Sequence, residues 1–107
     1  MEIIEKDGGS VRIAVLEGDL TADDGMHMRD VILDAMRSPS CRRLYFDMSN
    51  VRFIGSSGLG VLLFGLRRLR EQKKELAICN VAPPVRKLFQ DIRLDAVLPM
   101  DEKVTVR

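Results

Sequence analysis

The segment FIGSSGLG, residues 53–60, places two serines between glycines, directly after one apolar run and directly before another. Gly55 permits a sharp bend, and serine is among the residues that best cap the start of a helix. We therefore expect the chain to leave a sheet just before Gly55 and to begin a helix capped by Ser56 or Ser57. The serines act either as a cap alone or, because a helix start favours negative charge, also as a site where an added phosphate is tolerated.

Strands and helices alternate on both sides of this segment. Short runs of β-branched and aromatic residues are typical of strands, and apolar residues three or four positions apart are typical of one face of a helix. Strands are expected at residues 3–4, 11–17, 43–47, 75–79 and 96–98, and helices between Thr21 and Ser38, at 57–74 and at 85–92. This order predicts an α/β fold in one domain over residues 1–107, with helices packed on a mixed β-sheet of about four to five strands.

Local signals fix the expected ends of the first helix. Gly18 is expected to end the strand before it. Thr21 is a favourable N-cap, and Asp23 and Asp24 place negative charge in the first turn, where the helix dipole favours it. The Ser38–Ser40 segment, Ser-Pro-Ser, stops the helix. These signals predict that Thr21, like Ser56, lies in a loop that leads into a helix.

The composition narrows the class of protein. The chain has 107 residues, of which 46% are hydrophobic and 31% charged, as in compact soluble domains. With 17 basic and 16 acidic residues the net charge is +1, which gives no reason to expect a nucleic acid partner. No apolar run approaches the roughly 20 residues of a transmembrane helix, and the start MEIIEKDGG is not a signal peptide. We expect a cytoplasmic protein without direct membrane insertion, whose Cys41 and Cys79 are free thiols.

Enzyme motifs are incomplete in this chain. A nucleophile elbow needs G-x-S-x-G, whereas residues 55–59 read GSSGL. A Walker loop would need Gly-Lys followed by Ser or Thr, and a dinucleotide fingerprint built on Gly58 and Gly60 would meet Leu63 where it needs glycine. His27 is the only histidine and the two cysteines lie far apart, so neither a catalytic triad nor a metal site is expected. We interpret the chain as a binding protein that is not an enzyme and has no cofactor.

Residues 44–60, LYFDMSNVRFIGSSGLG, resemble the signature of the STAS domain, the fold of bacterial anti-sigma factor antagonists. That signature is a strand with D-x-S, then V-x-F-I/M, then D-S-S/T-G-L-G at a helix start. The matching residues are Asp47, Ser49, Val51, Phe53, Ile54, Ser56, Ser57, Gly58, Leu59 and Gly60. Residues 18–20 and 81–89 also resemble family segments, so the similarity covers nearly the whole chain and implies a STAS-type sheet.

The resemblance implies a regulatory cycle. In antagonists of this kind, the unphosphorylated protein binds an anti-sigma factor that is itself a serine kinase. Phosphorylation of the first serine of the motif abolishes binding, and a phosphatase restores it. That serine is Ser56 here, with Ser57 the less favoured candidate. The expected partner-binding residues are Thr21, Gly55, Ser56, Ser57, Gly58 and Leu59, on a protein that is a monomer or a weak dimer.

Three positions and the C-terminal segment depart from the family pattern. Gly55 and Thr21 stand where the family usually has aspartates, and Arg93 stands where a glycine usually ends the third helix, so a different helix end is expected. Residues 100–107 are shorter than the family's usual last helix. The two missing aspartates leave a second interpretation open, namely a STAS adaptor subunit of an ABC transporter or of a stress-signalling scaffold that is not phosphorylated.

The helix after Ser57 carries two further sets of residues. The apolar set is expected to lie mostly in the core, with one or two members exposed beside Ser56. It comprises Leu59, Leu62, Leu63, Phe64 and Leu66. The basic set is expected to be a solvated face, with a docking surface as the alternative. It comprises Arg67, Arg68, Arg70, Lys73 and Lys74.

Overall fold

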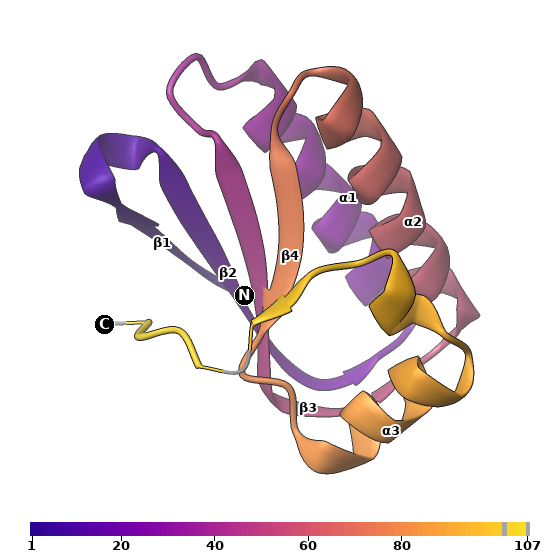
Figure 1. Ribbon diagram of the computed structural model, residues 1–107. Coiled ribbons are helices and arrows are strands. Elements are labelled where there is room, and N and C mark those ends of the chain that lie inside the picture. Colours follow the sequence, from indigo (N-terminus) through magenta and orange to yellow (C-terminus); the bar gives the residue numbers. More distant parts are fainter. Residues whose placement is uncertain (102, 107) are drawn as a thin grey trace.

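A computed structural model describes residues 1–101 and 103–106 (Figure 1). Within that part of the chain, five strands form one sheet in the order β1-β2-β3-β4-β5. They are β1 (Glu2–Lys6), β2 (Val11–Leu20), β3 (Arg43–Ile54), β4 (Glu75–Cys79) and β5 (Met100–Asp101). The β1–β2 hairpin is antiparallel and turns through a short 3-10 segment, Asp7–Gly9, whereas the other neighbours are parallel. The predicted α/β fold with a mixed sheet is confirmed.

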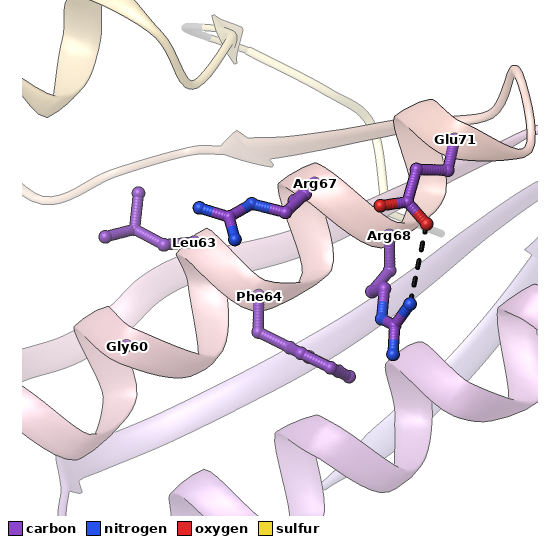
Figure 2. Close-up of a pocket in the computed structure, with 6 residues that line it drawn as sticks. All are labelled: Gly60, Leu63, Phe64, Arg67, Arg68 and Glu71. Atoms are coloured by element: carbon purple, nitrogen blue, oxygen red, sulfur yellow. Dashed lines mark hydrogen bonds and ion pairs between the residues drawn. The ribbon is translucent and has the colours of Figure 1, made fainter.

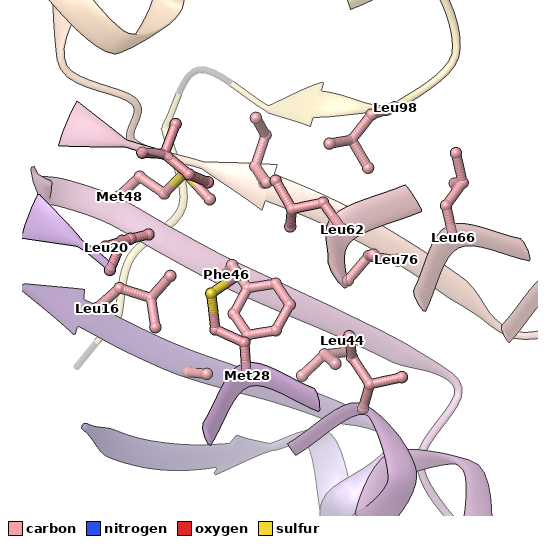
Figure 3. Close-up of a cluster of buried hydrophobic side chains, with 14 of the residues drawn as sticks. Leu16, Leu20, Met28, Leu44, Phe46, Met48, Leu62, Leu66, Leu76 and Leu98 are labelled. Atoms are coloured by element: carbon pink, nitrogen blue, oxygen red, sulfur yellow. The ribbon is translucent and has the colours of Figure 1, made fainter. Parts of the chain in front are cut away.

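Parallel neighbours need crossover connections, and helices supply them. They are α1 (Ala22–Arg37), α2 (Ser56–Glu71) and α3 (Pro83–Asp91). In Figure 1, α1 and α2 lie side by side against one face of the sheet, with α3 below them. Their inward side chains and those of the sheet form the larger core, in which Phe46, Met28 and Leu62 are fully buried (Figure 3).

Gly65 allows α2 to approach both α1 and the sheet. A Cβ at this position would lie 2.6 Å from Ile32 Cδ1 and 3.1 Å from Leu76 Cδ2, closer than packed carbon atoms tolerate. Glycine is otherwise unfavourable inside a helix by roughly 1 kcal/mol relative to alanine. The close packing of α2 therefore depends on this residue.

Lys74 has a role that the sequence did not suggest. It is 7% exposed, and its Nζ donates hydrogen bonds to the carbonyl oxygens of Ala35 (2.8 Å), Met36 (3.3 Å) and Ser38 (2.7 Å). The last carbonyls of a helix have no partner within it and carry its negative dipole end, so a cation there is favourable. The prediction that Lys74 belongs to a solvated basic face is therefore wrong.

Both long strands extend further than predicted. Gly18 does not end β2, which continues to Leu20 through an irregular register at Gly18, where φ is +76°. Similarly, β3 runs on past Asp47 to Ile54. Register shifts between β2 and β3 absorb extra residues, so polar stretches that look like turns remain paired.

Three predicted ends also differ. The predicted strand at 96–98 is wrong, because residues Leu94–Ala96 form a 3-10 turn and the last strand is β5. The helix predicted over 57–74 begins one residue earlier and ends at Glu71. Arg93 has φ of 59°, the left-handed conformation that glycine favours after a helix, so the expectation of a different end for α3 is wrong. Cys41 and Cys79 are buried and not joined in a disulfide, as expected.

Candidate functional site

The pairing of β2 with β3 brings two helix starts together. Leu20 pairs with Ile54 at the carboxyl ends of these parallel strands, and the Gly55 N–H donates to the Leu20 carbonyl oxygen at 3.2 Å. The next residues, Thr21 and Gly55, are the N-caps of α1 and α2. The sequence-predicted residues Thr21 and Ser56, far apart in the chain, therefore lie at the same edge of the sheet, where parallel sheets commonly present their sites.

The start of α1 is closed by a carboxylate. The Thr21 N–H donates to Asp24 Oδ2 at 2.8 Å and the Thr21 hydroxyl donates to the same oxygen at 2.9 Å, in a capping box. The backbone hydrogen bond from Thr21, followed by the hydroxyl bond, lowers the pKa of Asp24 below its ordinary value of 3.8. The predicted N-cap is thus confirmed, and one carboxylate binds both donors of the residue that stands where the family has an aspartate.

This cap predicts a pH dependence of stability. Because the folded-state pKa of Asp24 is lowered, its contribution to stability is present above the ordinary carboxyl pKa and is lost as the pH falls through the lowered value. Urea unfolding at a series of pH values between neutral and acidic should therefore show a smaller acid-induced loss for Asp24→Asn than for the wild type. Asp23→Asn is the matched control, since the Thr21 donors bond Asp24. Equal acid sensitivity of Asp24→Asn and the wild type would contradict this assignment.

The start of α2, unlike that of α1, has no side chain bonded to its N-cap. Gly55 is the N-cap, with no side-chain hydrogen bond to the helix, and Ser56 and Ser57 occupy the first two helical positions. The prediction that one of the serines is the N-cap is therefore wrong, although the helix does begin here. The first turn holds no acidic residue, whereas the first turn of α1 holds two. Both serines are exposed, so their hydroxyls and the positive helix end face solvent.

Two glycines hold this edge together. A Cβ on Gly58 would lie 2.7 Å from Ile54 Cγ1, so only glycine lets α2 turn directly off β3. A Cβ on Gly25 would lie 3.6 Å from Ser57 Cβ, so α1 passes close to Ser57. Gly58 is buried and Leu59 is half-buried. Gly58, one of the predicted partner-binding residues, is therefore not exposed to a partner and instead allows α2 to pack against Ile54.

Exposed apolar side chains come from the elements that meet at this edge. Met26 in α1 is 67% exposed, Phe53 at the end of β3 is 57% exposed and Leu63 in α2 is 48% exposed. The expectation that one or two apolar residues of α2 are exposed is confirmed by Leu63. Large exposed apolar side chains at one edge are typical of protein interaction surfaces.

The outer surface of α2 continues from this edge. Leu63 and Arg67 lie one turn apart and point away from α1, whereas Phe64 and Arg68 point toward it (Figure 2). The Phe64 ring lies 4.3 Å from the guanidinium carbon of Arg29 of α1, and Arg68 pairs with Glu71 at 3.5 Å. A shallow hollow of about 500 Å³ lies between these rows of side chains. Most of the predicted basic set is thus exposed, and Arg67 and Arg68 are part of this surface.

The D-x-S part of the signature is structural. Asp47 is 1% exposed, and its carboxylate accepts hydrogen bonds from the Ser49 N–H at 3.1 Å, the Ser49 hydroxyl at 2.7 Å and Asn80 Nδ2 at 2.6 Å. A buried carboxylate needs such donors to offset its desolvation. Asp47 therefore ties β3 to the residue that follows β4 and does not form part of the exposed edge.

The described residues form neither a cluster of metal ligands nor a membrane-spanning helix. In residues 1–101 and 103–106, no three His, Cys, Asp or Glu side chains gather as metal ligands would. The described helices are all too short or too polar to span a bilayer.

Comparison with known proteins gives consistent results. A family model described as "Mlab, STAS domain" matches residues 4–100. The anti-sigma F factor antagonist of Paenibacillus polymyxa is 30% identical over 90 residues, which cover 84% of this chain and 77% of that protein. The anti-sigma-B factor antagonist of Staphylococcus aureus is 31% identical over 75 residues, covering 70% and 69%. Unphosphorylated SpoIIAA, an anti-sigma factor antagonist, superposes with a TM-score of 0.76 at 20% identity over 96% of this chain and 88% of its own.

Proposed function

Because this chain belongs to the STAS domain family, we propose that it acts as an anti-sigma factor antagonist, a regulatory module that binds an anti-sigma factor and catalyses no reaction itself. Both named relatives are antagonists of this class. Residues 1–107 would act as one domain in the cytoplasm, as a monomer or weak dimer. No nucleic acid takes part in this proposal.

The observation that carries the proposal is the edge shared by the starts of α1 and α2. It combines exposed hydroxyls at Ser56 and Ser57 with the apolar side chains of Met26 and Phe53. Interfaces are typically built from such apolar anchors surrounded by polar groups. The partner would contact Thr21, Gly55 and the two serines, with Leu59 at the border of the contact.

We propose that Ser56, or less favourably Ser57, is the switch. A kinase-type anti-sigma factor would transfer the γ-phosphoryl group of ATP to the serine oxygen, with release of ADP and of the hydroxyl proton. The phosphate adds a charge of about −2, which the open start of α2 tolerates but a packed partner surface does not. A phosphatase would reverse the change. Support comes from SpoIIAA, which has been solved in unphosphorylated and phosphorylated forms.

A charge at Ser56 should weaken binding. We expect Ser56→Asp to lower the affinity for the anti-sigma factor by about tenfold or more, because the added carboxylate is desolvated or repelled at the interface, whereas Ser56→Ala keeps most of it. The partner is captured from lysate of the source organism with the immobilised protein, identified by mass spectrometry, purified and titrated. Ser40→Asp is the matched control, since Ser40 is exposed at the opposite end of the sheet.

Two outcomes decide between the proposed mechanisms. Release of the captured anti-sigma factor by Mg-ATP, with phosphate found on Ser56, supports the switch. If no anti-sigma factor is captured, the antagonist role is wrong. If an anti-sigma factor is captured but Ser56→Asp binds it like Ser40→Asp, the switch at Ser56 is wrong.

An adaptor that is not phosphorylated is the second candidate. It is favoured by the absence of a side chain at Gly55 and by the engagement of Thr21 with Asp24, which leave Ser56 without the family's neighbouring aspartates. This candidate predicts that an ABC transporter subunit or scaffold protein is retained and that Mg-ATP does not release it.

A further inference from the structure

The face of the sheet opposite the helices has its own small core. Its buried residues come from three neighbouring strands: Ile13, Val15, Tyr45, Ala77 and Cys79. Val104 and Val106 pack against this cluster, while Lys103 and Thr105 between and beside them are exposed. In Figure 1, residues 103–106 lie on the side of the sheet away from α1 and α2. Its alternating pattern is that of an extended peptide with one face buried.

Asn80 binds the backbone of this segment. Its side-chain Nδ2 donates to the Val104 carbonyl oxygen at 2.8 Å, and its Oδ1 accepts from the Val104 N–H at 2.8 Å. One amide thus pairs with both backbone groups of one residue, as a neighbouring strand would. The Lys6 ammonium donates to the next carbonyl oxygen, that of Thr105. These hydrogen bonds involve only the backbone of the segment and do not depend on its side chains. Selection among side chains therefore comes from the apolar cluster on which Val104 and Val106 pack.

The groups that bind the segment, the Asn80 amide and the apolar cluster, are fixed by contacts with strands of the sheet. Asn80 Nδ2 also donates to the buried carboxylate of Asp47 at 2.6 Å, which fixes the orientation of the amide. Ala77 and Cys79 on β4 have small side chains, so the cluster leaves room for branched side chains from above. The recognition elements therefore belong to the sheet and not to the segment that lies on it.

We propose that this face is a binding site for an extended peptide with apolar side chains at alternate positions, and that residues 104–106 occupy it as an internal ligand that can be released while the rest of the fold stays intact. In this site the Asn80 side chain hydrogen-bonds the N–H and C=O of one peptide residue, and two β-branched side chains of the peptide pack on the apolar cluster. It lies on the opposite face of the sheet from α2 and is independent of the function proposed above.

The two cysteines report on release. Cys79 lies in the cluster beneath the segment, whereas Cys41 lies in the larger core on the helical face. We expect Val104→Asp to speed maleimide labelling of Cys79 about tenfold or more, because it removes the burial of a valine side chain. The rate at Cys41 should not change. Labelling of each cysteine is followed in the folded full-length chain by mass spectrometry, with Thr105→Asp as the matched control at an exposed position of the same segment.

A peptide tests whether the face is a site. Lys-Val-Thr-Val, the sequence of residues 103–106, should slow Cys79 labelling of the Val104→Asp variant when added in large excess, whereas Lys-Thr-Val-Val, which lacks the alternation, should not. The proposal is overturned if Cys79 and Cys41 speed up together, if Thr105→Asp acts like Val104→Asp, or if neither or both peptides protect Cys79.

Discussion

Replacing Lys74 with methionine is expected to lower the free energy of unfolding by about 3 kcal/mol, since hydrogen bonds from a charged donor contribute roughly 1.5–3 kcal/mol each and part of that gain is offset by burial of the ammonium. Methionine keeps the length of the side chain but donates nothing to the carbonyl oxygens of Ala35, Met36 and Ser38. The end of α1 would lose its partners and its favourable charge. Urea unfolding followed by circular dichroism measures the loss.

Lys73→Met is the matched control for this prediction. Lys73 is the neighbouring residue, carries the same charge and is exposed. Its replacement should change the free energy of unfolding by less than about 0.5 kcal/mol, as is usual for surface positions. If the two variants were equally stable, the three hydrogen bonds of Lys74 would not contribute measurably to the fold.

Replacing Phe46 with alanine should have a larger effect, a loss of about 4 kcal/mol, because truncation of a buried phenylalanine removes its apolar contacts and leaves a cavity. Phe46 is fully buried and lies between Met28 and Leu44 in the centre of the helix-side core (Figure 3). Helices and sheet both contribute to its surroundings, so little of the cavity can close by local movement. The expected loss is a large part of the stability of a small domain.

Phe53→Ala separates stability from function. Phe53 belongs to the same strand but is 57% exposed at the proposed binding edge. We expect this variant to unfold within about 1 kcal/mol of the wild type while binding the anti-sigma factor at least about tenfold more weakly, since an exposed aromatic is a typical binding anchor. Equal destabilisation by the two substitutions would show that Phe53 is packed, and unchanged binding would remove it from the interface.

The sequence predicted the fold where local and tertiary signals agree. Thr21 is an N-cap in the structure because threonine is favoured at that position and the Asp24 carboxylate, three residues later, binds its N–H, and both residues are visible in the sequence. The bend at Gly55 and the helix after it were likewise predictable. The proximity of Thr21 and Ser56 followed from the family resemblance alone, since only the register of β2 with β3 brings them together.

Other features depend on contacts between distant residues. In the sequence, Lys74 is one of several basic residues close together. Nothing near it in the sequence indicates that its Nζ binds the end of a helix about 36 residues earlier in the chain, at Ser38. The strand predicted at 43–47 was too short because polar residues interrupt the alternation after Asp47, but Asp47 binds Ser49 and β2 keeps the strand paired as far as Ile54. The last strand was misplaced because Val97 and Leu98 have strand propensity while tertiary packing overrides it.

The strand order β1-β2-β3-β4-β5 has a consequence for synthesis on the ribosome. Each strand pairs with the strand made just before it, so the growing sheet adds new strands at one open edge and never has to admit a later strand between two earlier ones. Such sequential topology keeps the loops that must close shorter than an order in which later strands insert between earlier ones. Since β2, α1, β3 and α2 together hold Thr21 and Ser56, the residues of the proposed switch are all made before β4, whose Leu76 completes the packing of α2.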